Sequence, residues 1–113
     1  MTIGPQRFLE LMRGLTSTSP DVRTNWAAAT TDWIRSFDSA EGAAAGVVLL
    51  NQALVEDDPD LLEELLHALA TLAEWDLVSA EYVRGIDGLD RSKLDPSSLE
   101  YVQYLESRLQ STR

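Results

Sequence analysis

The side chains that could do chemistry in this sequence are many carboxylates and one histidine, His67, because the chain contains no cysteine. A Ser–His–Asp arrangement would have to use His67 as its base. Helical spacing aligns His67 with Glu63, Glu64, Thr71 and Glu74, on the face opposite a stripe of leucines. We therefore expect His67 to be a solvated side chain whose charged form is favoured by the neighbouring acids, and not a general base.

Two acidic segments have the residue types of a calcium loop without its spacing. Segment 56–60 reads Glu-Asp-Asp-Pro-Asp, and segment 87–95 begins Asp-Gly-Leu-Asp. Neither has the alternating oxygen ligands, central glycine and terminal glutamate of such a loop. The glycines are scattered and form no phosphate-binding motif, and Glu63 and Glu64 are expected on a convex polar face with no pocket. We expect no metal, no cofactor, no small-molecule substrate and no enzymatic activity.

Charge is unevenly distributed along the chain. The formal net charge is −10, from 19 acids and 9 bases. No Lys or Arg occurs between Ser36 and Val83, a stretch of 48 residues that holds eleven acids. A surface this negative repels nucleic-acid phosphates and anionic membranes, and it attracts a basic protein by long-range steering. The alternative is that these acids only keep the surface soluble.

Prolines predict the starts of the helices. Ser19-Pro20, Asp58-Pro59 and Asp95-Pro96 each place an N-cap residue before a proline at the first helical position. The Pro-Asp-apolar triplet at 20–22 recurs at 59–61, and the Ser-Ala-Glu triplet at 39–41 recurs at 79–81. These recurrences indicate an internal repeat of about forty residues.

Apolar residues at spacings of three and four predict the face that each helix buries. Small residues beside the stripe that follows Ala40 predict the close approach of another helix. We expect Trp26 and Trp33 to lie in the core. A brief helix is expected from Glu81 to Ile86. The predicted stripes are Phe8, Leu11, Met12 and Leu15; Val22, Trp26, Ala29, Thr30, Trp33 and Phe37; Ala43, Val47, Leu50 and Leu54; Leu61, Leu62, Leu65, Leu66, Leu69, Leu72 and Ala73; and Leu99, Val102, Leu105 and Leu109.

These patterns predict an all-α fold of about five to six helices. Because the connections are short, we expect the helices to form antiparallel pairs that stack as a short solenoid. We expect a single domain over residues 1–113, with no strand. Apolar runs fall far short of the roughly 18 residues that a membrane span needs. The N-terminus has no basic start followed by an apolar stretch, so we expect a cytoplasmic protein.

Two blocks resemble HEAT-type helical repeats. The first is Ser19-Pro20-Asp21-Val22-Arg23 followed by Trp26-Ala27-Ala28-Ala29, and the second is Asp58-Pro59-Asp60-Leu61-Leu62 followed by Leu66 and Ala68-Leu69-Ala70. The second block departs from the first by having Leu62 in place of Arg23. The resemblance extends from Thr18 to Ile86 and implies a scaffold that binds proteins, or sometimes DNA.

Two functions remain open. In size, acidity and helical character the chain resembles small bacterial immunity proteins, which implies an inhibitor of a basic partner, a cognate toxin domain such as a nuclease. A variant of this function is mimicry of a nucleic acid, with carboxylates in place of phosphates. The alternative is a HEAT-like scaffold or adaptor in a larger assembly. Trp75 is either a contact anchor or part of the core. We predict a contact surface in the acidic middle of the chain, formed by Asp57, Asp58, Asp60, Glu63, Glu64, Glu74, Trp75 and Asp76.

Overall fold

The described part of the computed structural model covers residues 1–111, so Arg113, one of the nine bases, lies outside it. Within this part the chain is helical and contains no strand, which confirms the predicted all-α class. None of its helices is both long and apolar enough to cross a membrane. The elements are α1 (Pro5–Leu15), α2 (Pro20–Asp32), η1 (Ile34–Ser36), α3 (Ser39–Val55), α4 (Pro59–Glu74), α5 (Ala80–Val83), η2 (Arg84–Gly88), η3 (Arg91–Lys93) and α6 (Pro96–Ser111).

The helices begin where the N-cap pattern predicts. The side chain of Ser19 accepts a hydrogen bond from Val22 N–H, and that of Asp58 accepts one from Asp60 N–H at 2.9 Å. Asp95 accepts a hydrogen bond from Ser98 N–H at 2.8 Å, at the start of α6. Each cap satisfies a backbone donor that has no partner within its own helix.

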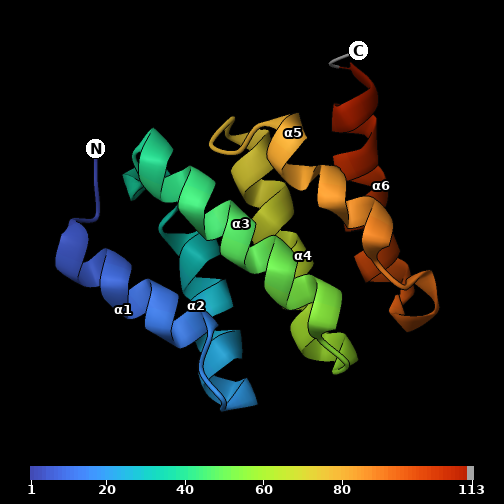
Figure 1. The fold of residues 1–113 in the computed structure, drawn as a ribbon, viewed down its shortest axis with the longest axis horizontal. Helices are drawn as coiled ribbons and strands as arrows, with labels where there is room; N and C mark the ends of the chain where they lie inside the picture. Colours follow the sequence, from blue (N-terminus) through green and yellow to red (C-terminus); the bar gives the residue numbers. More distant parts are fainter. Residues whose placement is uncertain (112–113) are drawn as a thin grey trace.

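The six α-helices of residues 1–111 form two layers of stacked pairs (Figure 1). Helices α1, α3 and α5 form one layer and α2, α4 and α6 form the other, with α1 packed on α2, α3 on α4 and α5 on α6. Neighbouring pairs contact through α1 with α3, α2 with α4, and α4 with α6. The shortest extent of the molecule, 18 Å, matches two helical layers about 8–10 Å apart between axes.

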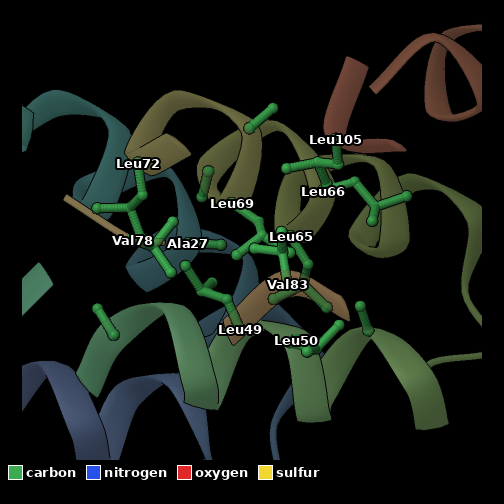
Figure 2. Packing of buried hydrophobic residues seen from close by; sticks show 14 of the residues in the cluster. Ala27, Leu49, Leu50, Leu65, Leu66, Leu69, Leu72, Val78, Val83 and Leu105 are labelled. Atoms are coloured by element: carbon green, nitrogen blue, oxygen red, sulfur yellow. The ribbon is translucent and has the colours of Figure 1, made fainter. Parts of the chain in front are cut away.

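Helix α4 is the centre of the core, because it packs against α2, α3 and α6 (Figure 2). All seven residues of its predicted stripe are buried: Leu61, Leu62, Leu65, Leu66, Leu69, Leu72 and Ala73. Ala68 and Ala70 are buried as well, so the apolar surface of α4 is wider than a single stripe. A helix that buries so much of its circumference lies inside the bundle.

On α3 the predicted stripe is only partly correct, because Leu50 is buried but most of the buried face consists of other residues. Val47 is 40% exposed, whereas Gly42 and Gly46 face the loop that follows α4. A Cβ atom on Gly42 would lie 2.7 Å from Leu77 Cβ, and one on Gly46 would lie 2.8 Å from Val78 Cγ2. The close contact that the small residues predicted is present, but it is made by this loop. The buried residues of α3 are Glu41, Gly42, Ala45, Gly46, Leu49, Leu50 and Ala53.

On α2 the predicted stripe is only partly correct. Val22 is 38% exposed, while Ala27, outside that stripe, is fully buried. Trp26 and Trp33 are half-buried rather than core residues, and their rings meet edge to face with centroids 5.8 Å apart. The indole of Trp26 covers Gly14 of α1 so closely that a Cβ atom there would lie 2.0 Å from the ring. The missing side chain at position 14 therefore makes room for this indole.

The two repeat blocks make different contacts at the position where the first block has Arg23 and the second has Leu62. The Arg23 guanidinium donates hydrogen bonds to Ser17 O at 2.8 Å and to Glu56 at 3.2 Å, which ties the α1–α2 loop to the end of α3. At the matching position of the second block, Leu62 is buried in the core. The brief helix expected from Glu81 to Ile86 is present as α5 continuing into η2.

Candidate protein-binding surface

The eight residues of the predicted contact surface lie along α4 and at its two ends. Asp57, Asp58 and Asp60 lie at its start, and Glu74, Trp75 and Asp76 at its end. Sixteen residues at about 1.5 Å per residue separate the two groups by about 24 Å. Glu63 and Glu64 lie between them and are half-buried. The structure therefore places these residues on one helix without gathering them into one cluster.

At the start of α4, two of the predicted acids have structural partners. Asp58 is the N-cap of α4. Asp57, whose side chain is 86% exposed, forms a salt bridge at 2.7 Å with Lys93 of η3. The hydrogen bond to Asp57 raises the pKa of Lys93 above its usual value. Asp60 is exposed and forms no salt bridge within residues 1–111.

At the end of α4 the backbone turns sharply and an arginine from α6 reaches it. Asp76 has a φ of 56°, a left-handed conformation that costs a non-glycine residue energy. Its carboxylate accepts a hydrogen bond at 2.5 Å from Arg108. Trp75 is 46% exposed, and the guanidinium of Arg35 lies 5.2 Å from the centre of its ring. Trp75 is thus available to a partner but already carries a cation on one face.

In the folded structure, bases from other parts of the sequence lie beside acids of the stretch between Ser36 and Val83, which itself contains no Lys or Arg. Arg23 pairs with Glu56, Lys93 with Asp57 and Arg108 with Asp76, so three acids of that stretch have a base from outside it. In the described chain the remaining acids on the outer side of α4 form no salt bridge. These acids are Asp60, Glu63, Glu64 and Glu74.

A hollow of about 310 Å³ lies between α4 and α6. The two helices run side by side in the same direction, since His67 stacks on Tyr101 and, further along both helices, Asp76 pairs with Arg108. The His67 and Tyr101 rings are nearly parallel, with centroids 5.1 Å apart and planes 18° apart. The residues that line the hollow are His67, Ala70, Thr71, Glu74, Glu100, Tyr101 and Tyr104.

This hollow corrects two expectations. His67 is half-buried and stacked, not a solvated side chain. The polar face of α4 is not a convex surface without a pocket, because α6 packs beside it and forms a concave groove. Both expectations were wrong because they considered only the residues of α4 itself. The helix has neighbours on three sides, and the alignment of His67 with acids on its own helix does not indicate where α6 lies.

The groove is an electronegative environment with aromatic walls. Burial raises the pKa of Tyr101, and the negative charges of Glu63, Glu64 and Glu100 raise it further. The same negative field that opposes ionisation of the phenol attracts a cation. Glu100, Tyr101 and Tyr104 were not predicted as site residues, although their spacing, which places them on one side of a helix, was a usable signal.

Comparisons with protein-family models, with curated proteins and with solved structures find no match for this chain. Within residues 1–111, no three His, Asp or Glu side chains are placed so that they could hold a metal ion.

Proposed function

We propose that this chain is an inhibitory binding protein, an immunity protein that neutralises a basic toxin domain in the bacterial cytoplasm. The observation that carries the proposal is the α4–α6 groove, where Glu74 and Glu100 line a hollow with aromatic walls and Glu63 and Glu64 lie nearby. Since these carboxylates form no salt bridge with the described bases, their charge is available to a positively charged protein. The groove, together with Asp60, replaces the acidic middle of the sequence as the proposed interface.

The net charge of −10 supports fast association with such a partner. Long-range attraction raises association rates well above those of uncharged pairs, and salt weakens the effect because it screens the field. Inhibition needs no chemistry from this chain, because occupying or flanking the basic groove of a nuclease excludes its substrate. The role is therefore that of a binding protein and not an enzyme.

A HEAT-like scaffold or adaptor is the second candidate. It is favoured by the stacking of α1/α2 on α3/α4 and of α3/α4 on α5/α6, and by the link that Arg23 makes between the α1–α2 loop and the end of α3. A scaffold of this kind would bind through the layer formed by α2, α4 and α6. It would have no effect on the toxicity of a neighbouring gene product, and this separates it from the first candidate.

Co-expression with the protein encoded by the adjacent upstream gene tests the inhibitor role. The expected result is that this chain restores growth of cells that produce the C-terminal domain of that protein and that the two proteins purify together.

The variant Glu63→Lys/Glu64→Lys should lose both effects while its circular dichroism spectrum stays that of a helical protein. A control with the same change in charge, Glu10→Lys/Asp32→Lys, alters two exposed residues of α1 and α2 and should retain both. Co-purification without rescue would favour the scaffold, and absence of both would refute the proposal.

A further inference from the structure

The α4–α6 groove combines three features that one kind of side chain recognises together. Its aromatic residues are His67, Tyr101 and Tyr104, and its carboxylates are Glu74 and Glu100. Its volume of about 310 Å³ is at the low end of the range for small-molecule pockets, about 300–1,000 Å³. A space of this size suits a single long side chain better than a cofactor.

A guanidinium matches this lining better than an ammonium or an apolar side chain. It is planar and stacks on aromatic faces, and its fork of N–H donors bonds carboxylates in a bidentate manner. The protein already shows this preference elsewhere, because Arg7 lies over Trp33 at 5.3 Å and Arg35 lies over Trp75 at 5.2 Å. An apolar side chain would leave the two carboxylates without a partner.

One cation of the chain itself, Arg108, interacts with the groove residue Tyr104. Hydrogen bonding to Asp76, together with the nearby Tyr104, raises the pKa of Arg108. Arg108 is therefore held at the α4 C-terminal end by Asp76, where its charge is balanced. Glu74 and Glu100 form no salt bridge with any described base, so the negative charge of the groove is not cancelled.

We propose that the α4–α6 groove is a receptor for an arginine side chain, which lies against Tyr101 and Tyr104 and donates to Glu74 and Glu100. The inference deepens the proposed function and rests on it, because the arginine would be the anchor residue of the basic toxin partner. Interfaces concentrate their binding energy in a few such anchors, and arginine is enriched among them.

The test uses the full chain and a defined probe, an acetylated peptide of four Gly-Arg repeats, followed by NMR. Two comparison peptides replace arginine with lysine, which keeps the charge, or with citrulline, which keeps the shape. We expect saturable shifts of the His67, Tyr101 and Tyr104 ring signals with the arginine peptide. We expect weaker shifts with the lysine peptide and none with the citrulline peptide.

Two variants with the same change in charge then locate the site. Glu74→Gln/Glu100→Gln should raise the dissociation constant of the arginine peptide about tenfold, because the charge-assisted hydrogen bonds are lost. Glu10→Gln/Asp32→Asn removes the same charge from exposed positions on α1 and α2 and should change it less than about twofold. Equal weakening by both variants, or shifts spread over all acidic surfaces, would overturn the inference.

The outcome is separable from that of the rescue experiment. Failure of the peptide to shift the groove signals, with rescue by the unmodified chain intact, would remove the arginine receptor and leave the inhibitor. Saturable binding of the peptide in the groove, with no rescue and no co-purification, would remove the inhibitor and leave a groove that recognises arginine.

Discussion

Glu41 provides the sharpest test of how the fold is stabilised, because one buried carboxylate connects two segments. It accepts hydrogen bonds from Asp38 N–H at 3.0 Å, from Ile3 N–H at 3.1 Å and from the Thr2 hydroxyl at 2.7 Å. The bond to Asp38 is half of the capping box that starts α3, and the other two attach the N-terminal segment to that helix. Replacing Glu41 with alanine removes all three.

The size of the effect follows from these contacts. Losing its half of the capping box costs about 1 kcal/mol, and losing the two bonds to the N-terminal segment costs about 1 kcal/mol each. We therefore expect Glu41→Ala to lower the free energy of unfolding by about 3 kcal/mol, which lowers Tm by about 12 °C in a domain of this size. Glu41→Gln, which keeps one acceptor oxygen, should cost about half as much.

Thermal and urea unfolding of both variants would measure this effect, with Glu10→Ala as the control. Glu10 is exposed on α1, and its carboxylate is not among the hydrogen-bond acceptors found in residues 1–111, so we expect a change within about 0.5 kcal/mol. If Glu41→Ala were no more destabilising than Glu10→Ala, the tether between the N-terminal segment and α3 would contribute nothing to stability.

The same carboxylate predicts a pH dependence. Burial alone would raise the pKa of Glu41, but the hydrogen bonds from Asp38, Thr2 and Ile3 lower it below its ordinary value of 4.5. A lowered pKa in the folded state means that the charged form stabilises the fold above that value, and that this contribution is lost as the pH falls through the folded pKa. The stability advantage of the native chain over Glu41→Gln should therefore shrink below pH 4.5. An advantage that stays constant or grows there would contradict this assignment.

Two further predictions concern packing between the helices. Gly14→Ala should destabilise the protein by about 2 kcal/mol and shift the fluorescence of Trp26, because the new methyl group collides with the indole. In the control Gly88→Ala, the new methyl group would lie 3.8 Å from Leu54 Cδ2, so we expect stability to change by less than about 0.5 kcal/mol. Arg23→Met should cost about 2 kcal/mol in urea unfolding, since it leaves the largely buried carboxylate of Glu56 without its base, and a cost near zero would show that this pair is only a surface contact.

The features that could be predicted from the sequence are those set by neighbours in the chain. N-caps such as Ser19 and Asp58 act on backbone groups two or three residues away, so the helix starts follow directly from local chemistry. The leucine stripe of α4 is dense enough that its direction is unambiguous. On α3, by contrast, alanine and glycine carry little hydrophobic signal, and the contacts of Gly42 and Gly46 with the α4–α5 loop decide which face is buried.

The features that could not be predicted depend on residues far apart in the chain. Lys93 and Arg108 neutralise Asp57 and Asp76 because the stack brings η3 and α6 beside the two ends of α4. His67 lies in a groove because α6 supplies Tyr101. Charge counted along the sequence therefore overstates how much of the acidic middle is available to a partner, and it does not include Glu100.

The central claim is that the carboxylates in and beside the α4–α6 groove, which form no salt bridge with a described base, bind a positively charged protein. Its most direct test is an association rate. Stopped-flow mixing with the C-terminal domain of the protein encoded by the adjacent upstream gene would measure this rate at several NaCl concentrations for the native chain, Glu63→Lys/Glu64→Lys and Glu10→Lys/Asp32→Lys. We predict a rate that falls steeply with salt for the native chain and the control, and a much lower rate with weak salt dependence for Glu63→Lys/Glu64→Lys. Equal rates for the two variants at every salt concentration would contradict the claim.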